Sequence, residues 1–266
     1  MNNVKEPILS GLKDWDDAIG GFVPGQFVII CARPAMGKSA FSITLAKKIA
    51  IVRNIPLAYF SMEMVNHQII RKLIANIFNC RTPAPIGSNS FDEADDIEAL
   101  APKVLADVPL YLDDEARLSL QKLENKIAEL RHNGVRIVII DYMQLLDGFE
   151  EDKELSLIKL KKIAEDYEVA IVALSQINRS EMIIMPDGSL DTGISKQILD
   201  DSYTKYADIV SVIHYPEFYQ KSETPYRDKN IAEIHFIKNV HCDTKLIKLN
   251  FNAKFAKFSN LREDYE

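Results

Sequence analysis

Residues 30–48 read ICARPAMGKSAFSITLAKK, in which an apolar run leads through a short loop into the tripeptide Gly-Lys-Ser. Beyond the tripeptide, apolar residues recur at the spacing of a helix face. A strand, a loop and a helix in this order are typical of a phosphate-binding loop, whose backbone amides and lysine contact the phosphates of a nucleotide. Ala32, however, occupies the position of the first glycine in the usual pattern G-x-x-x-x-G-K-S/T.

The residues of this loop predict a site for ATP and Mg²⁺. Gly37 lets the backbone come close to the phosphates, Lys38 would reach the β- and γ-phosphates, and Ser39 would ligate Mg²⁺. The helix predicted over residues 39–52 would turn its positive N-terminal end toward the anion. The alternative is a strand–turn–helix in which Gly-Lys-Ser occurs by chance, but the strand predicted over residues 27–31 favours the nucleotide site. The predicted nucleotide-binding residues are Arg33, Pro34, Ala35, Met36, Gly37, Lys38, Ser39 and Ala40.

Three polar residues lie where other predicted strands end. Asp141 ends the run VRIVIID, at the place where a phosphate-loop enzyme carries the acid that holds magnesium. Glu63 follows the run LAYFS and could deprotonate an attacking water molecule. Gln176 follows the run VAIVALS and could sense the γ-phosphate. Each residue has an ordinary alternative: an aspartate that caps a turn, a glutamate that favours a helix dipole, and a polar residue where the chain leaves the sheet.

The order of the predicted elements indicates an α/β fold. Predicted strands alternate with helices, which favours a mostly parallel central sheet flanked by helices. The last strand-like runs, ADIVSVIHY, IAEIHFIKN and TKLIKLNFN, have short connections, which predict antiparallel hairpin strands at the C-terminal end. We expect a single domain over residues 1–266, with residues 1–10 as a lead-in and DWDDAIGGFVPGQ as a series of turns. The predicted parallel strands are 27–31, 57–61, 110–112, 135–141 and 169–175.

Composition limits the classes of protein that remain. Hydrophobic residues make up 47% and charged residues 27% of the 266 residues, which suits a globular core. No apolar run reaches the roughly 18 residues of a membrane span, so we expect no membrane partner. The three cysteines are widely spaced, which fits a reducing cytoplasm better than a disulfide framework. The net charge of −7 does not attract nucleic acid, so DNA binding would require a local basic groove.

Four motifs together resemble one family. The stretches GLKDWDDAIGGFVPGQFVIICARPAMGKSAF, AYFSMEM, IVIIDYMQLL and ALSQINRS have the order and spacing found in the RecA-like ATPase domain of DnaB-type replicative DNA helicases. That family typically reads A-R-P-x-M-G-K-S/T at its phosphate loop, so Ala32 is a mark of the family. The resemblance covers roughly residues 11–252, which is nearly the whole chain.

The resemblance implies a role for each predicted residue. Lys38 and Ser39 would bind phosphate and Mg²⁺, with Asp141 reaching the metal through water. Glu63 would be the catalytic base, and Gln176 would couple the γ-phosphate to the loop that follows it. The resemblance also adds Lys238, a catalytic residue that would reach the ATP site of the neighbouring subunit.

The resemblance implies partners as well. Helicases of this group form homo-oligomeric rings, here expected to be a hexamer, that move on single-stranded DNA. A helicase loader or a primase is a further expected partner. The loops after Asp141 and Arg179 would face the central channel, and the predicted DNA contacts are Arg179, Lys196 and Lys205.

Three departures from the family pattern leave alternatives open. Val240 occupies the place of an arginine finger, a residue worth about 10³ to 10⁵ in rate in other phosphate-loop enzymes. The channel stretch carries Asp200 and Asp201, which would repel phosphates if they faced the channel. The sequence begins about ten residues before the resemblance, so we expect either an excised domain or a natural short form without the helical N-terminal domain and linker of the family, and weaker ring assembly in consequence. The first hypothesis is a helicase motor domain, and the second is a weakly hydrolysing ATP-binding protein that partners or regulates a helicase ring. A recombinase-like or clock-type ATPase, and a metal site at His241 and Cys242, are less favoured.

Overall fold

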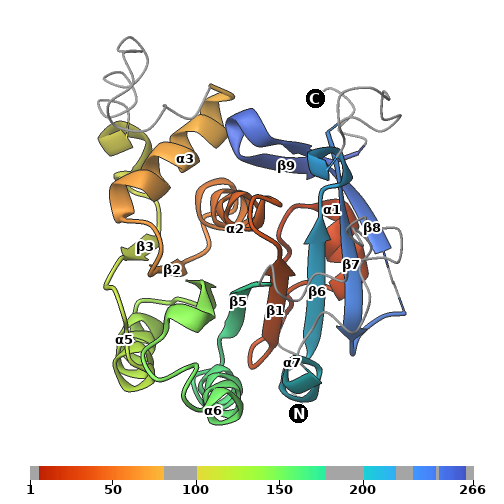
Figure 1. The fold of residues 1–266 in the computed structure, drawn as a ribbon. Helices are drawn as coiled ribbons and strands as arrows, with labels where there is room; N and C mark the ends of the chain where they lie inside the picture. The colour runs from red at the N-terminus through yellow and green to blue at the C-terminus, as the bar shows by residue number, and fades with distance from the viewer. Residues whose placement is uncertain (1–5, 81–100, 178–200, 220–229, 244–245, 262–266) are drawn as a thin grey trace, which may run out of the picture.

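The computed structural model describes residues 6–80, 101–177, 201–219, 230–243 and 246–261. Its strands form one sheet in the order β3-β2-β4-β5-β1-β6-β7-β8-β9 (Figure 1). The first six strands in the chain run parallel to one another, and the last three pair antiparallel. The predicted mostly parallel sheet with C-terminal hairpin strands is confirmed, but β6, expected among the hairpin strands, also pairs parallel with β1. The strands are β1 Phe27–Ala32, β2 Leu57–Ser61, β3 Leu110–Asp113, β4 Ile137–Asp141, β5 Ala170–Gln176, β6 Ile209–His214, β7 Ile231–Asn239, β8 Leu246–Asn252 and β9 Lys257–Asn260.

Helices cover both faces of this sheet (Figure 1). Successive strand residues point to opposite faces, so Val28 and Ile30 join the apolar cluster under α2, and Phe27 and Ile29 join the cluster under α6. Strands covered on both faces are apolar throughout, which explains the unbroken runs in the sequence. The helices on the first face are α1 Lys13–Ile19, α2 Lys38–Ala46 and α3 Asn66–Phe78, and those on the second are α5 Leu120–His132, α6 Lys153–Asp166 and α7 Asp201–Tyr206.

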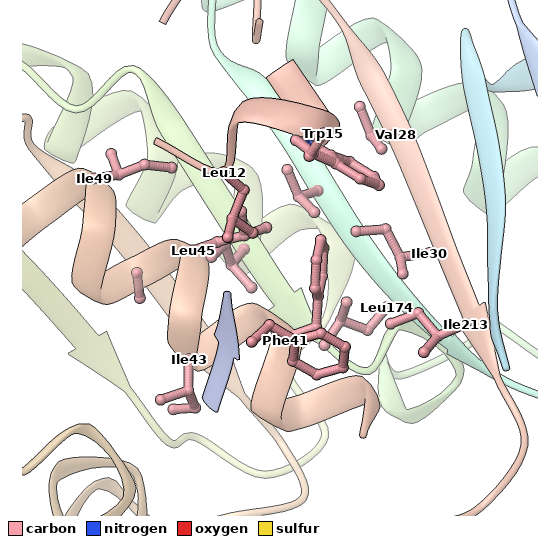
Figure 2. Close-up of a cluster of buried hydrophobic side chains, with 14 of the residues drawn as sticks. Leu12, Trp15, Val28, Ile30, Phe41, Ile43, Leu45, Ile49, Leu174 and Ile213 are labelled. Atoms are coloured by element: carbon pink, nitrogen blue, oxygen red, sulfur yellow. The ribbon is translucent and has the colours of Figure 1, made fainter. Parts of the chain in front are cut away.

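The prediction of turns near the N-terminus was wrong for residues 13–19, which form helix α1, whereas Pro24 and Gly25 do form a turn. Trp15 is fully buried, with its ring 5.0 Å from the ring of Phe41 (Figure 2). The ring of Phe236 lies 5.5 Å from that of Trp15. The carboxylate of Asp16 accepts hydrogen bonds from the backbone amides of Ser10 and Gly11, at 2.7 and 2.8 Å. Tertiary packing and this buried carboxylate therefore stabilise a helix that its own length would not.

A second short helix lies within the stretch expected to be a channel loop. Residues 201–206 form α7, which packs against α6 through the buried side chain of Tyr203. Asp201 is in the first turn of this helix, where its charge favours the helix dipole. Asp200 lies outside the described residues.

Replacement of Trp15 by alanine tests the role of α1. Loss of this fully buried indole should lower the free energy of unfolding by about 3–5 kcal/mol, because the cavity left between α1 and α2 cannot close completely. Urea denaturation followed by circular dichroism measures the change. Val52→Ala is the control, because Val52 is 68% exposed and should change stability by less than about 0.5 kcal/mol. Equal stability of the two variants would contradict the packing role of α1.

Candidate nucleotide-binding site

The strand order brings the predicted site residues together at the carboxyl ends of the parallel strands. β2 pairs with β4 so that Ser61 lies opposite Asp141, and β5 pairs with β1 so that Gln176 lies opposite Ala32. The carboxyl ends of these four parallel strands are therefore side by side, which is where open α/β sheets bind ligands. Glu63 follows β2 by two residues and is held there because the amide of Met62 donates to the Asp141 carbonyl at 3.0 Å.

The phosphate loop connects β1 to α2 in a conformation that requires glycine at its last position. Gly37 has a φ of 90°, and a Cβ there would lie 2.8 Å from Cζ of Phe251. Met36 anchors the loop from below, because it is buried and its sulfur accepts a hydrogen bond from the amide of Tyr215 at 3.4 Å. Lys38 is the first residue of α2, so the loop ends at the positive end of a helix.

Lys38 and Asp141 form a buried ion pair at the base of the loop. Nζ of Lys38 lies 2.9 Å from Oδ1 of Asp141 and 3.9 Å from Oε2 of Glu63. It also lies 4.1 Å from the ring centroid of Tyr142. Asp141 is completely buried and the Glu63 side chain is 45% exposed, so the two acids have different environments on either side of one lysine.

The second oxygen of Asp141 has a partner that sequence reasoning missed. The hydroxyl of Tyr59 donates a hydrogen bond to Oδ2 of Asp141 at 2.9 Å, and Ser42 Oγ lies 2.8 Å from the same hydroxyl. Burial, together with the negative charge of Asp141, raises the pKa of Tyr59 well above its usual value, so the phenol stays protonated. The signal in the sequence was a phenol within the apolar run LAYFS, but its partner lies 82 residues away.

A cavity of about 370 Å³ opens over the loop. Most predicted site residues line it, but Met36, which is a buried residue of the loop, and Asp141 are not among the lining residues. The cavity also brings in Lys72, whose pKa is lowered by burial and whose Nζ contacts the sulfur of Met64 at 3.0 Å. The lining residues are Arg33, Pro34, Ala35, Gly37, Lys38, Ser39, Ala40, Glu63, Lys72, Gln176, Phe251, Ala253 and Ala256.

Gln144 connects the loop after β4 to the end of β5. Its amide nitrogen donates to the hydroxyl of Ser175 at 2.8 Å and to the carbonyl of Gln176 at 3.0 Å. Its carbonyl accepts from the amide of Gln176 at 3.3 Å. These hydrogen bonds tie the end of β5 to the turn that follows Asp141, a link that sequence reasoning did not predict.

Lys238 lies away from the cavity, at the side of the sheet where the parallel strands have their amino ends. β7 runs antiparallel to β6, so the carboxyl end of β7 meets the amino end of β6. There Nζ of Lys238 donates to the carbonyl of Ala207 at 2.6 Å. Lys238 therefore cannot serve the cavity of its own chain, and its predicted role in a neighbouring subunit stays a prediction. Val240 follows on the same side and is 54% exposed.

The residues predicted to contact DNA are only partly described. Arg179 and Lys196 lie outside the described residues. Lys205 is on the exposed side of α7, 3.4 Å from a carboxylate oxygen of Glu154. His241, considered as a metal ligand with Cys242, has its Nε2 atom 2.9 Å from the side-chain nitrogen of Gln26.

A phosphate loop between β1 and α2, with acids after β2 and at the end of β4, defines a phosphate-loop nucleotide-binding domain with a RecA-like sheet. The family model for the DnaB-like helicase C terminal domain matches residues 7–260, and the chain belongs to this family. Both the resemblance and the fold class predicted from the sequence are confirmed.

Known proteins show the same relationship. The chain is 28% identical to the replicative DNA helicase DnaB of Haemophilus influenzae, over 97% of this chain and 56% of that protein. It is also 28% identical to the replicative DNA helicase DnaB of Geobacillus stearothermophilus, over 97% of this chain and 58% of that protein. The chain therefore spans little more than half the length of these relatives.

Solved structures support the fold. One of them, described as an ATPase domain, superposes with a TM-score of 0.82 at 24% identity, covering 98% of this chain and 94% of that one. A DnaB-like replicative helicase, solved to describe its interactions with primase, gives the same TM-score and identity and covers 65% of that chain. Within the described part of this chain, every helix is too short or too polar to span a bilayer.

Replacement of Lys38 by alanine should remove nucleotide binding. The variant loses the ammonium that would contact the phosphates, and charge-assisted hydrogen bonds of this kind contribute about 1.5–3 kcal/mol each. We expect the affinity for a fluorescent ATP analogue to fall at least about tenfold, since 1.4 kcal/mol corresponds to a factor of ten. Lys13→Ala, which removes a lysine whose side chain is 74% exposed, is the control. Unchanged binding by a folded Lys38→Ala variant would refute the assignment of the loop.

Proposed function

We propose that this chain is the ATP-hydrolysing motor domain of a replicative DNA helicase, which translocates on single-stranded DNA in the cytoplasm. The observation that carries the proposal is the placement of Lys38 between Asp141 and Glu63 at the edge of the cavity. The proposal is supported by membership of the DnaB-like family, whose curated relatives are named as replicative DNA helicases.

ATP would bind with its phosphates against the loop amides and Lys38. Ser39 lines the cavity at the start of α2 and Asp141 lies behind Lys38, so the two offer the oxygen ligands that Mg²⁺ prefers, with Asp141 acting through water. Mg²⁺ in this position would neutralise charge on the phosphates and hold them in line for attack. Lys38 would exchange its contact with Asp141 for the phosphate oxygens.

Glu63 is the proposed base for hydrolysis. Its carboxylate lines the cavity and is partly exposed, so a water molecule can reach it beside the γ-phosphate. Glu63 would accept a proton from this water while the water oxygen attacks phosphorus, and the bond to the leaving ADP breaks. Gln176 would contact the γ-phosphate, and Gln144 would pass its movement to the loop after Asp141.

Assembly and DNA binding complete the proposal. We propose a homo-oligomeric ring, with six subunits expected, in which Lys238 of each subunit reaches the ATP site of its neighbour. Single-stranded DNA would pass through the centre near Arg179, Lys196 and Lys205, and a helicase loader or primase would bind the ring. These partners belong to the proposal, because the chain spans little more than half of the relatives' length.

One observation favours the second candidate, a weakly hydrolysing partner or regulator of a helicase ring. Val240 is exposed, lies on the same side of the sheet as Lys238 and carries no charge. A neighbouring subunit that met this surface would therefore find no guanidinium there. A steady-state ATPase assay with and without single-stranded DNA separates the candidates. Turnover stimulated by DNA supports the motor, and tight ATP binding without stimulated turnover supports the regulator.

Glu63→Gln should keep nucleotide binding and lose turnover. The amide keeps the size of the carboxylate but cannot accept a proton, and general-base catalysis typically contributes about 10²- to 10⁴-fold in rate. Release of phosphate measures turnover, and the fluorescent analogue measures binding. Glu129→Gln, an exposed change on α5, is the matched control and should behave as the unmodified protein. If Glu63→Gln retained its turnover, the base would lie elsewhere.

Val240→Arg tests whether a missing guanidinium limits the rate. If Val240 faces a neighbour's γ-phosphate, arginine should increase turnover per subunit at protein concentrations at which the ring forms, and should have no effect on dilution. Val240→Gln is the control, because it adds a polar side chain of intermediate length without charge. Equal rates for the two variants over the whole concentration range would contradict a contact between Val240 and the neighbouring site.

A further inference from the structure

Two hydroxyl groups behind the cavity form a path of contacts between the two residues proposed to hold magnesium. Ser42 Oγ lies 2.9 Å from the backbone carbonyl oxygen of Ser39. The hydroxyl of Tyr59 donates to Oδ2 of Asp141 at 2.9 Å, and Ser42 Oγ lies 2.8 Å from the same hydroxyl. Ser42 has one hydroxyl hydrogen, so it donates either to the Ser39 carbonyl or to the Tyr59 oxygen. The path therefore runs from the first turn of α2, through the middle of β2, to the last residue of β4.

Because Asp141 is buried, the hydroxyl of Tyr59 on this path supplies one of the two contacts that fix its carboxylate. Ser42, Tyr59 and Asp141 each have 0% of their surface exposed. A carboxylate without solvent needs hydrogen-bond donors at its oxygens, since an unsatisfied buried oxygen costs about 1–3 kcal/mol. Lys38 supplies the donor at Oδ1 and Tyr59 the donor at Oδ2, so two different elements set the plane of the carboxylate.

Packing alone does not require the hydroxyl of Tyr59. Its ring belongs to the apolar cluster under α2, where the ring of a phenylalanine would fill the same space. Only the phenol oxygen has polar neighbours, which are the carboxylate of Asp141 and the hydroxyl of Ser42. A polar atom held so specifically among apolar side chains indicates a role in orienting its partner.

We propose that Tyr59 is a positioning residue for magnesium binding, and that Ser42 supports it when it donates a hydrogen bond to the Tyr59 oxygen. When Lys38 turns to the phosphates of a bound nucleotide, Tyr59 remains as the donor that keeps the Asp141 carboxylate aimed at the cation. Tyr59 itself contacts neither nucleotide nor metal. Partners of this kind orient metal ligands, and their removal typically lowers metal affinity about 10- to 100-fold. The inference rests on the proposed function, because it presumes a magnesium–nucleotide site.

The test compares nucleotide affinity with and without magnesium. Tyr59→Phe removes the hydroxyl and keeps the ring, and Ser42→Ala removes the hydroxyl that contacts the Tyr59 oxygen. The dissociation constant of a fluorescent, non-hydrolysable ATP analogue is measured in saturating Mg²⁺ and in excess chelator, and the ratio of the two is the gain due to magnesium. Tyr59→Phe should reduce this gain about tenfold, and Ser42→Ala should reduce it by less. Affinity in chelator should stay close to that of the unmodified protein.

Thr44→Val is the matched control on the same helix. Thr44 is buried and its Oγ1 atom donates to the Ala40 carbonyl and accepts from Asn76 and the amide of Phe258, at 2.9, 3.1 and 3.1 Å. Its loss removes buried hydrogen bonds that do not reach Asp141. Thr44→Val should therefore lower thermal stability and leave the magnesium gain unchanged.

Each outcome decides the inference. A folded Tyr59→Phe variant with the gain of the unmodified protein would overturn it, as would an equal loss of gain in Thr44→Val. If Tyr59→Phe does not fold, Ser42→Ala decides, and an unchanged gain in that variant overturns the inference. The proposed function fails separately, if the unmodified protein binds the analogue no better with Mg²⁺ than without it.

Discussion

The buried contact between Lys38 and Asp141 constrains the rest of the site. Asp141 has no exposed surface, so it needs the cation, and Lys38 reaches it from α2 across the intervening strand β5. Breaking a buried pair by removing one partner costs about 3–5 kcal/mol, because the remaining charge is left uncompensated. A ligand that takes Lys38 away must therefore bring an anion for the lysine and a cation for the aspartate. Magnesium–ATP carries both charges, and this explains why nucleotide and metal are expected to bind together.

The register of the sheet creates this contact. Because Ser61 lies opposite Asp141, the chain leaving β2 passes beside the aspartate, and Glu63 meets Lys38 two residues later. A slip of one residue would exchange the two faces of β2 and carry Tyr59 from the cluster under α2 to the opposite one, away from Asp141. The core and the site thus depend on the same pairing. Tyr59 precedes Phe60 in β2 and points to the side of the sheet covered by α2. This pairing brings its hydroxyl into contact with Asp141.

The sequence predicted what depends on local pattern and strand ends. Lys38 is recognised from a loop between a strand and a helix, and Glu63 and Asp141 from their positions after apolar runs, because parallel strands end at one edge. Helix α1 was missed because seven residues give little periodicity, and it is stabilised by contacts of Trp15 with residues far along the chain. Tyr59 was missed for a related reason. Its hydroxyl has meaning only once β2 and β4 are paired, and no spacing within one segment shows that pairing.

The antiparallel end of the sheet divides the proposed function between two surfaces. β6 ends beside the phosphate loop, and β7 runs in the opposite direction, so Lys238 lies near the start of β6. β8 runs in the same direction as β6, so Phe251 near its end lines the cavity. If Lys238 acts on a nucleotide, it acts on one bound to another copy of the chain, which demands a head-to-tail contact. Contacts of this type close into a ring when the rotation permits, and otherwise continue as a helix. In either assembly Val240 would lower the positive charge offered to the neighbour's γ-phosphate without changing which two surfaces meet.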